Sequence, residues 1–268
     1  MKSLAIIGAG YLQRPVVERA KEMGIRTICF SWPQGAVCKD VCDVFYPVSI
    51  TEKDEILALC RKEQIDGICT IASDVAAPTV AYVAEKMGLP GNSYVSALRA
   101  HDKHQMREVL KAAGVECPGY VALNDRDGGK INILQKMDCM QLHLPLIVKP
   151  TDRSGSLGVQ KVTRWEDLTP AIRHAEELSL AGEAMVEEYI EGREISVEMI
   201  SQHGTHYALQ ITDKVTTGAP HFVELAHRQP SSLPAEMQER IFALTRRALD
   251  ALGITDGASH SEYRITAE

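Results

Sequence analysis

The first ninety residues alternate short apolar runs with longer stretches whose apolar positions recur at helical spacing. The apolar runs predict strands, and the amphipathic stretches between them predict helices. The predicted strands are residues 4–7, 26–30, 45–48 and 67–71, and the predicted helices are residues 12–23, 52–62 and 76–87. Such βαβ alternation is typical of a parallel sheet with helices on both faces. We therefore expect a doubly wound α/β domain over residues 1–92.

The pattern changes after residue 92, where two helical stretches lead to strands with alternating polar and apolar positions. Alternation of this kind indicates strands that are buried on one face, and so antiparallel sheets. The predicted helices are residues 94–100, 102–113, 165–181 and 235–252, and the predicted strands are residues 146–149, 159–163, 184–188, 194–201, 205–212, 222–226 and 259–266. We expect two subdomains, residues 93–183 and residues 184–268, so that the chain combines α/β and α+β parts.

Composition and charge narrow the function classes. The 268 residues are 45% hydrophobic and 24% charged, which is typical of a globular protein with a sizeable core. A formal net charge of −7 argues against sequence-independent binding to nucleic acid or an anionic membrane, and an aromatic content of 5% argues against a base-stacking surface. We expect small-molecule substrates, with no nucleic acid and no membrane as partners.

Two further features predict the compartment. The chain enters its first strand without a basic segment, a long apolar run or a cleavage site, and no window approaches the roughly 18 apolar residues of a membrane helix. The seven cysteines are an odd number, lie in apolar stretches and form no C-x-x-C pair. We therefore expect reduced, buried thiols and a cytoplasmic protein.

The turn Gly8-Ala9-Gly10 lies where the first predicted strand passes into a helix. Two glycines permit a tight turn there, and a helix N-terminus can hold an anion. Two parts of the dinucleotide-binding fingerprint are missing, because Gln13 occupies the position of its third glycine and no acidic residue ends the second strand. A structural turn or a small-ligand contact is favoured, and an NAD(P)-dependent oxidoreductase remains a weaker alternative.

The loop after the strand at residues 146–149 is a candidate phosphate-binding element. Lys149 ends this strand, and the loop after it contains Ser154, Gly155 and Ser156. One cation at a strand end and several backbone amides can surround phosphate oxygens. The lysine precedes the glycine, so the loop is not a P-loop. An ordinary flexible hairpin with a solvated lysine is an equally good interpretation of these residues alone.

A second segment, residues 185–198, favours the phosphate-binding interpretation. It contains Glu-Glu-Tyr-Ile-Glu-Gly-Arg-Glu between two predicted strands. Together with Asp102-Lys103 on a helix, Val148-Lys149-Pro150 at a strand end and the Gly-rich loop, it gives four ordered motifs that resemble the ATP-grasp superfamily. The resemblance covers nearly the whole chain. The first ninety residues are similar to the Rossmann-like domain before the ATP-grasp fold in carbamoyl-phosphate synthase large subunits and biotin carboxylases.

The resemblance implies a nucleotide site in which two lysines contact the ATP phosphates from opposite sides. Glu187 and Ile190 would present backbone groups to the adenine, and Glu194 would hold the ribose hydroxyls. Glu188 stands where relatives contact adenine through a lysine or another polar residue. An exposed acidic strand end is the alternative for Glu187 and Glu188. The implied nucleotide-binding residues are Lys103, Lys149, Ser154, Gly155, Ser156, Glu187, Glu188, Ile190 and Glu194.

The segment 214–230 is dense in functional groups for a strand-loop-strand stretch. Glu224 and His227 form E-x-x-H, which resembles the acceptor-site region of L-amino-acid ligases of the bacilysin-synthetase type. A carboxylate can hold an α-ammonium group, and a histidine can orient a substrate or move a proton near neutral pH. The proline-flanked, extended setting does not suit the dinuclear metal sites that use E-x-x-H on helices. We assign Glu224, His227 and Lys149 as catalytic residues, with a solvated loop as the alternative.

Glu262 lies in the last predicted strand, where ATP-grasp enzymes place their first Mg²⁺-binding glutamate. The resemblance implies a second metal ligand on a returning strand beyond Glu268, so we expect a fragment, a split gene product or a shortened form. Mg²⁺ uses one or two carboxylates plus substrate phosphates. This form should therefore bind nucleotide and turn over poorly. An unpaired strand edge also suggests a homodimer.

These features predict an ATP-dependent ligase that forms a C–N bond. ATP would phosphorylate a carboxylate, and the amine of an amino acid would displace phosphate from the acyl phosphate in a peptide-forming reaction. ATP and Mg²⁺ would be the cofactors. A carboxylase related to carbamoyl-phosphate synthase fits the same general similarity. A non-catalytic nucleotide-binding fragment remains the main alternative from another class.

Overall fold

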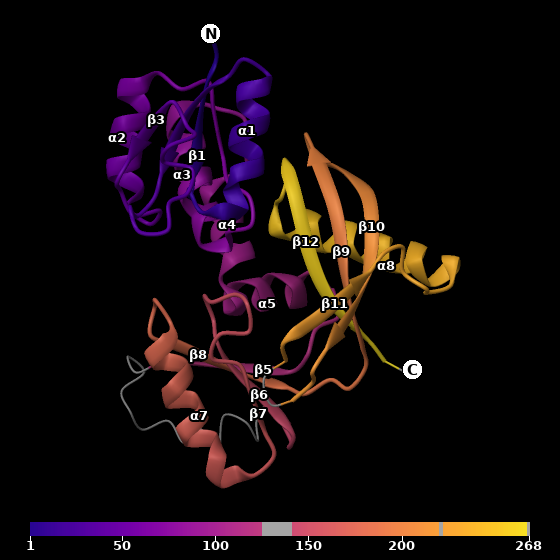
Figure 1. The fold of residues 1–268 in the computed structure, drawn as a ribbon. Helices are drawn as coiled ribbons and strands as arrows, with labels where there is room; N and C mark the ends of the chain where they lie inside the picture. Colours follow the sequence, from indigo (N-terminus) through magenta and orange to yellow (C-terminus); the bar gives the residue numbers. More distant parts are fainter. Residues whose placement is uncertain (125–140, 220–221, 267–268) are drawn as a thin grey trace. The chain divides into compact units, whose positions relative to one another are not determined.

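A computed structural model describes residues 1–124, 141–219 and 222–266 of the chain (Figure 1). They form two compact units, residues 1–101 and residues 102–268. The first unit contains the parallel part of the predicted fold, and the second contains the antiparallel part. The subdomain boundaries expected at residues 92 and 183 remain predictions.

The first unit is built on a four-stranded parallel sheet in the order β3-β2-β1-β4. Its strands are β1 (Ser3–Ile7), β2 (Arg26–Phe30), β3 (Val44–Tyr46) and β4 (Gly67–Cys69). Its helices are α1 (Arg14–Glu22), α2 (Lys53–Glu63), α3 (Ala77–Met87) and α4 (Tyr94–His101), with short 3₁₀ turns at Tyr11–Gln13 and Asp74–Ala76. The strand order and the alternating helices confirm the doubly wound arrangement.

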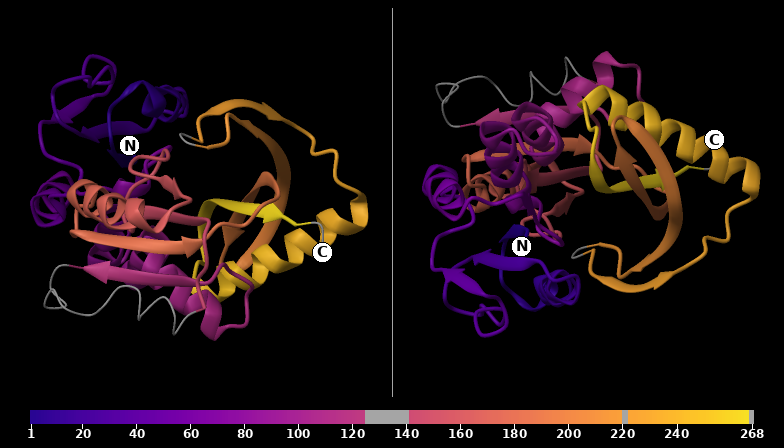
Figure 2. Two further views of the ribbon diagram at one scale, coloured as in Figure 1. Left: turned by 90° about the horizontal axis from the view of Figure 1, so that it is seen from below. Right: turned by 90° about the horizontal axis from the view of Figure 1, so that it is seen from above.

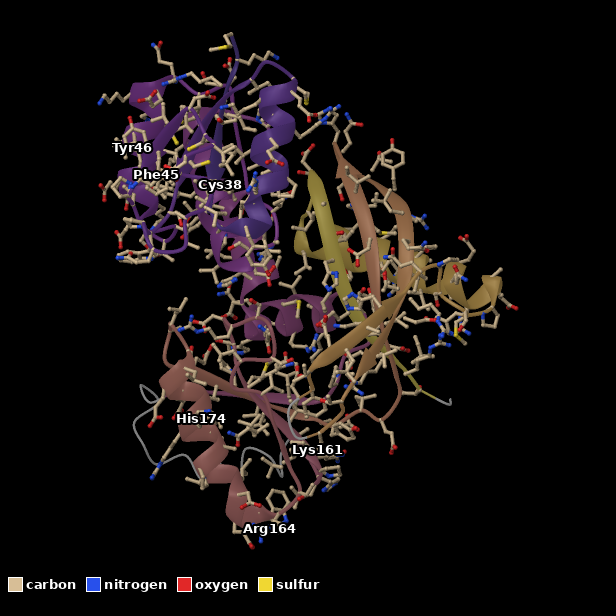
Figure 3. The ribbon with its side chains drawn as sticks, viewed as in Figure 1. Cys38, Phe45, Tyr46, Lys161, Arg164 and His174 are labelled. Carbon is tan, nitrogen blue, oxygen red and sulfur yellow. The ribbon has the colours of Figure 1, made fainter. Side chains whose placement is uncertain are left out.

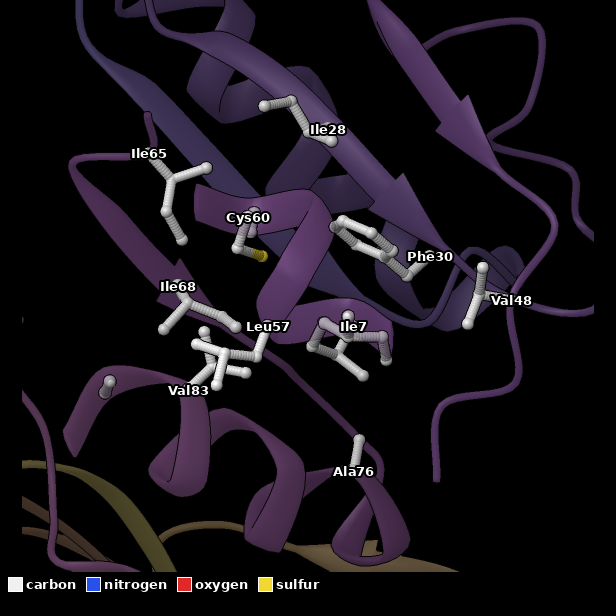
Figure 4. Packing of buried hydrophobic residues seen from close by; sticks show 13 residues of the cluster. Ile7, Ile28, Phe30, Val48, Leu57, Cys60, Ile65, Ile68, Ala76 and Val83 are labelled. Atoms are coloured by element: carbon white, nitrogen blue, oxygen red, sulfur yellow. The ribbon is translucent and has the colours of Figure 1, made fainter. Parts of the chain in front are cut away.

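Alternate residues of these strands face two different hydrophobic cores. Ile7 and Phe30 pack with Leu57 of α2 and Val83 of α3 on one face of the sheet (Figure 4). The intervening strand residues, among them Ile6 and Cys29, pack with Val17 of α1 in a second cluster. Because successive side chains of a strand point to opposite faces, the continuous apolar runs of β1 and β2 serve both cores.

The second unit contains two four-stranded antiparallel sheets. One, in the order β5-β8-β6-β7, consists of β5 (Tyr120–Asn124), β6 (Leu146–Pro150), β7 (Gln160–Val162) and β8 (Glu183–Glu188), with α7 (Trp165–Leu178) packed against it. The other, in the order β11-β10-β9-β12, consists of β9 (Arg193–Gln202), β10 (Thr205–Thr216), β11 (Glu224–Arg228) and β12 (Gly257–Ile265), with α5 (Lys103–Ala112) and α8 (Ala235–Leu252).

Each sheet of the second unit buries one face under a helix, as Figures 1 and 2 show for α7 and α8. The buried residues of α7 recur at helical spacing, so they form one apolar stripe along the helix. On β9 the odd positions Ile195, Val197 and Met199 are at most 1% exposed and pack in the α8 core. The parallel sheet and the two antiparallel sheets confirm the predicted fold class.

Two differences from the predicted elements affect the site. β5 was not predicted. β10 was expected to end at residue 212, but it continues through Asp213 and Lys214, two residues that are depleted in strands. Asp213 is buried here because its carboxylate accepts hydrogen bonds from Ser231 Oγ at 2.5 Å and from the Ser232 amide at 3.0 Å.

The described cysteines are free thiols, and half of them are fully buried. Burial raises the pKa of Cys60 to about 12 and the pKa of Cys69 to about 11, which makes these thiols poor nucleophiles. Among the described cysteines, Cys29, Cys38 and Cys60 are buried as expected, and their reduced state stays a prediction. None of the helices that the structure describes has both the length and the apolar character needed to cross a membrane.

Candidate functional site

Two cations and one carboxylate form a buried ion cluster, which we call the Lys149 cluster. Lys149 on β6 and Glu187 on the adjacent strand β8 are diagonal neighbours on one face of the sheet. The Lys149 ammonium donates to Glu187 Oε2, and Arg107 Nε on α5 donates to Glu187 Oε1 at 2.7 Å. The Glu187 side chain is 5% exposed. Two positive charges share one negative charge, so the cluster has a net positive charge.

Burial and neighbouring charges set the ionisation of the Lys149 cluster. Burial lowers the pKa of Lys149 and Arg107 lowers it further, whereas the carboxylates of Glu187 and Glu262 act in the opposite direction. Burial would raise the pKa of Glu187, but the charges of Lys149 and Arg107 outweigh it and hold that pKa below its ordinary value. Because Glu262 lies on β12, its influence on Lys149 indicates that β12 and β6 are within electrostatic reach of each other.

Lys103 brings a further cation to the loop that follows Lys149. Helix α5 starts after the N-cap residue Asp102, whose side chain accepts a hydrogen bond from the Gln105 amide at 2.7 Å. The Lys103 amide then donates to Thr151 O at 2.9 Å, and its ammonium donates to Arg153 O at 2.5 Å. Lys103 and Lys149 therefore flank the same loop, as their assignment to one phosphate site requires.

The loop itself has an anchored base and an exposed tip. Asp152 is buried and accepts hydrogen bonds from the amides of Leu180 and Ala181 at 3.1 and 2.8 Å. At the tip, Gly155 and Ser156 both adopt positive φ, at 64° and 57°. Ser154, Gly155 and Ser156 are all exposed. Their backbone amides are thus at the surface, on a loop whose base is fixed to residues 178–181.

A second ion cluster has the opposite balance of charge, and we call it the Lys214 cluster. The Lys214 ammonium contacts Glu224 Oε1 at 2.6 Å, Glu194 Oε1 at 3.4 Å and the Glu262 carboxylate. The Lys214 side chain is 2% exposed, whereas the side chains of Glu224 and Glu262 are 48% and 55% exposed. Three carboxylates share one ammonium group, so the cluster has a net negative charge.

The pKa values of the Lys214 cluster follow from these contacts. Burial would lower the pKa of Lys214, but its hydrogen bonds to Glu224 and Glu262 outweigh burial and raise the pKa. His260 donates to Glu198 Oε1 at 2.9 Å and lies 3.6 Å from Glu262. Its interaction with Glu262 is the main cause that lowers the pKa of Glu262 to about 2 and raises the pKa of His260 to about 9.

Glu224 and His227 are brought together by an irregularity in β11. In a regular strand, residues three apart point to opposite faces. Here Val215 pairs with Ala226 and Thr216 pairs with Glu224, so Leu225 is an extra residue in the ladder. The bulge returns Glu224 to the face of His227, whose Nε2 donates to Glu224 Oε2 at 3.0 Å. The predicted extended setting of E-x-x-H is confirmed.

The segment after β8 links the two sheets of the second unit through Tyr189. Lys161 of β7, labelled in Figure 3, places its ammonium 3.5 Å from the centre of the Tyr189 ring, and the Arg264 guanidinium lies 5.7 Å from it. Glu188 is exposed and turns its carboxylate toward the Gly119 amide at 3.4 Å, beside β5. Ile190 is half-buried. Glu188 is thus outside both ion clusters.

The Gly8 turn of the first unit is filled by the chain itself. Gly8 has φ of +103°, and a Cβ there would lie 3.1 Å from Gln13 Cδ. Gln13 Oε1 accepts a hydrogen bond from the Gly10 amide at 3.0 Å, and Gln13 Nε2 donates to Ile71 O at 2.7 Å. The side chain at the third motif position therefore occupies the turn, which supports a structural role and not a pyrophosphate site.

The family model described as ATP-grasp domain matches residues 142–268. This segment belongs to the ATP-grasp family. It contains Lys149, the Gly-rich loop, Glu187 and the whole Lys214 cluster, whereas Lys103 and Arg107 of α5 precede it. The resemblance predicted from the four ordered motifs is confirmed.

Comparison with individual proteins gives amino-acid ligases. The chain is 25% identical over 236 residues to alanine–anticapsin ligase of Bacillus subtilis (strain 168), covering 79% of this chain and 48% of that protein. It is 25% identical over 225 residues to D-alanine–D-alanine ligase of Pseudomonas putida (strain GB-1), covering 77% and 65%. The crystal structure of L-amino acid ligase from Bacillus licheniformis superposes with a TM-score of 0.79 at 24% identity, covering 100% of this chain and 64% of that chain.

The chain spans about half to two thirds of the length of these proteins. The structural likeness extends over both units, so the chain shares its fold with that L-amino acid ligase.

The predicted site lacked two cluster residues, Arg107 and Lys214, and two neighbours of the Lys214 cluster, His260 and Arg264. Each of them left a signal in the sequence. Arg107 follows Lys103 by four residues on one helix, so both side chains lie on the same helix face. Lys214 is a charged residue in an extended, otherwise uncharged run after Asp213. His260 and Arg264 alternate with Glu262 along β12 and therefore share its face.

The carboxylates of the ATP-grasp segment fit a metal ion only in combination with other oxygens. Among the residues that the structure describes, no group of three or more His, Cys, Asp or Glu side chains is arranged to hold a metal ion by itself. Glu194, Glu224 and Glu262 nevertheless converge on Lys214. Mg²⁺ typically takes one or two carboxylates and completes its coordination with phosphate oxygens and water. The donor set thus suits a cation that arrives with a nucleotide.

Proposed function

We propose that the chain is an ATP-dependent carboxylate–amine ligase that acts on amino acids. The observation that carries the proposal is the pair of ion clusters with opposite net charge in one unit. The Lys149 cluster, with Lys103 and the exposed loop amides, is suited to anionic phosphates. The Lys214 cluster offers carboxylates to a cation. The three amino-acid ligases that resemble the chain support the C–N bond and the substrate class.

The nucleotide would lie between these clusters. Lys103, Lys149 and the amides of Ser154, Gly155 and Ser156 would hold the phosphates. Backbone groups at Glu187 and Ile190 would contact the adenine, and Glu194 would accept hydrogen bonds from the ribose. The buried Glu187 side chain has a further task, because its hydrogen bonds fix the positions of Lys149 and Arg107. Glu188, directed at Gly119, would contribute at most a backbone contact.

The proposed reaction has two steps. A carboxylate oxygen of the first substrate attacks the γ-phosphorus of ATP, a P–O bond forms, and the bond to the leaving ADP oxygen breaks. The amine of the second substrate then attacks the acyl carbon, a C–N bond forms, and phosphate leaves. Lys103 and Lys149 would neutralise charge on the transferred group, so positioning and electrostatics would supply the catalysis.

Glu224 and His227 would hold the attacking amine. The Glu224 carboxylate can accept a hydrogen bond from the substrate ammonium, and His227 lies 3.0 Å from that carboxylate. The amine has to lose a proton before or during attack, and the Glu224 carboxylate, to which His227 Nε2 donates a hydrogen bond, is the group placed to accept it. Their position beside Lys214, which pairs with His227 across the ladder, puts the amine close to the transferred phosphate.

Mg²⁺ is part of the proposal, with Glu262 as its protein ligand. When bound, it would neutralise the charges of the β- and γ-phosphates during transfer. Glu262 is suited to this because its carboxylate is half-exposed and ionised far below neutral pH. We further propose small-molecule partners, a cytoplasmic location without nucleic acid or membrane contacts, and self-association through a sheet edge, which size-exclusion chromatography can test.

Thermal shift and phosphate release test the proposal together. Mg-ATP should raise the melting temperature and NAD(H) should not, because the cations lie at the Gly-rich loop and Gln13 fills the Gly8 turn. Phosphate release is then measured with Mg-ATP and mixtures of amino acids. An ATP-induced shift without any phosphate release would favour a nucleotide-binding protein without ligase activity. Equal shifts with ATP and NAD(H) would contradict the nucleotide assignment.

A further inference from the structure

The face of the second sheet that bears the Lys214 cluster is arranged in four rows across β12, β9 and β10. Residues opposite one another in an antiparallel ladder share a face, and successive rows are two residues apart along each strand. The first row carries the Arg264–Glu194 ion pair and the second carries Glu262. The rows are Arg264–Glu194, Glu262–Ser196–Thr212, His260–Glu198–Gln210 and Ala258–Ile200–Tyr207.

The fourth row is apolar and open to solvent. Ile200 is 45% exposed and Tyr207 is 51% exposed, and Ala258 is also exposed. On β9 the other positions of this face are polar, namely Glu194, Ser196 and Glu198, while the apolar positions belong to the core face. Ile200 therefore departs from the polar pattern of its own face, and burial in the core does not explain it.

The polar row next to it pairs a carboxylate with an imidazole. Glu198 Oε1 accepts hydrogen bonds from His260 Nδ1 at 2.9 Å and from Ser196 Oγ at 3.1 Å. The Glu198 side chain is 31% exposed, so the carboxylate can also accept a hydrogen bond from a ligand. A carboxylate beside an open apolar patch complements a molecule with an ammonium group and an apolar side chain.

We propose that Ile200, Tyr207 and Ala258 bind the side chain of the substrate that is phosphorylated, and that they select an amino acid with a large apolar side chain. This inference rests on the proposed ligase function. Glu198 accepts hydrogen bonds from the ammonium group of that amino acid. The attacking amine occupies the opposite side of Lys214, at Glu224 and His227 on β11.

The spacing of the rows supports this assignment. Glu262 is in the second row and Ile200 is in the fourth, so they are two row spacings apart, which corresponds to about 13 Å along the strands. A metal ion on Glu262, the phosphoryl group and an amino acid with a branched or aromatic side chain together bridge a span of this size. Glycine or alanine would leave the apolar row uncovered, so their binding would gain nothing from it.

Binding of two amino acids by wild type and three variants tests the inference. L-leucine and glycine are titrated calorimetrically into protein saturated with Mg²⁺ and a non-hydrolysable ATP analogue. We expect wild type to bind leucine at least about tenfold more tightly than glycine. The double variant Ile200→Ala/Tyr207→Ala should lose this preference through weaker leucine binding alone. Glu198→Gln should weaken both ligands by the same factor. Met23→Ala, which changes a side chain that is 61% exposed in the first unit, should change neither.

Three results would overturn the inference. One is a leucine preference that survives in the double variant, provided that all variants keep the wild-type melting temperature. Another is the absence of heat with both amino acids. The third is self-association of wild type that the double variant abolishes without changing amino-acid binding, which would make the apolar row a contact between copies. Phosphate release is measured separately: its absence alongside an intact leucine preference would overturn the ligase function and leave the subsite in place.

Discussion

The Lys149 and Lys214 clusters solve opposite electrostatic problems with the same residue types. In the Lys149 cluster one carboxylate is nearly buried between two cations, and the members come from α5, β6 and β8. In the Lys214 cluster the cation is buried and two of the three carboxylates, Glu224 and Glu262, are half-exposed. Its members come from β9, β10, β11 and β12. The single carboxylate of the Lys149 cluster and the single ammonium group of the Lys214 cluster are buried. In each cluster the more numerous groups of opposite charge surround it.

The difference indicates what each cluster can accept. A buried carboxylate under two cations leaves positive charge available to an anion, and a buried ammonium under three carboxylates leaves negative charge available to a cation. Mg-ATP contains both an anion and a cation, so it combines the charges that the two clusters complement. Because the single carboxylate or ammonium group is buried, its removal should lower the free energy of unfolding more than the removal of any one of the oppositely charged groups around it.

The largest effect is expected for Lys149→Ala. ATP affinity should fall about 100-fold, because a partly desolvated cation is removed and Glu187 is left with Arg107 alone. Lys39→Ala, which removes an exposed lysine of the first unit, is the matched control and should leave ATP affinity unchanged. Equilibrium titration with a fluorescent ATP analogue measures both. Equal affinities for the two variants would show that the loop after β6 is only a hairpin.

Lys214→Met should reduce stability more than any change of a single carboxylate around it. Three carboxylates would lose their common counter-ion, and we expect the free energy of unfolding at pH 7 to fall by about 2 kcal/mol, a value reduced for the exposure of the carboxylates. The loss should be smaller at pH 4, where the carboxylates of the variant take up protons. Urea unfolding at the two pH values measures the effect. A loss that does not depend on pH would contradict an ionic role for Lys214.

Sequence patterning was sufficient for the fold but not for the pairing of charges. Strand and helix periodicity predicted most elements. The motif order assigned Lys103 and Lys149 to one phosphate site and Glu187 to the adenine, and this assignment stays a prediction. Arg107 and Glu187 are 80 residues apart, and no local pattern encodes their contact. The bulge at Leu225 inverts the facing of Glu224 relative to a regular strand, and periodicity cannot show such an insertion. Lys214 was missed because a buried, charged strand residue contradicts the usual hydrophobic signal.

Glu262→Gln tests how much one carboxylate of the Lys214 cluster contributes to stability at acid pH. The folded-state pKa of about 2 lies below the ordinary value of 4.5, so Glu262 stabilises the fold above pH 4.5, and this contribution is lost as the pH falls through 2. Because solvent screens the charge of this half-exposed side chain, we expect a contribution of about 1 kcal/mol to the free energy of unfolding. Urea unfolding should therefore show a difference between wild type and variant at pH 6 that shrinks toward pH 2. Glu239→Gln, an exposed change on α8, is the control, and a difference constant across this range would contradict the assignment.

His260→Gln gives the smallest expected effect, and its pH dependence has the opposite sign. The pKa of His260 is raised from 6.5 to about 9 by Glu262 and Glu198, so its ion pairs stabilise the fold fully below pH 6.5. This stabilisation is lost as the pH rises through 9, and for a half-exposed side chain it amounts to about 0.5 kcal/mol. Wild type should therefore lose stability relative to His260→Gln between pH 6.5 and pH 9.5. His203→Gln, which changes an 85% exposed histidine, is the control. If wild type and His260→Gln showed parallel profiles over this range, His260 would not share in the charge balance of the Lys214 cluster, and the excess of negative charge at that cluster would be larger than the contacts of β12 indicate.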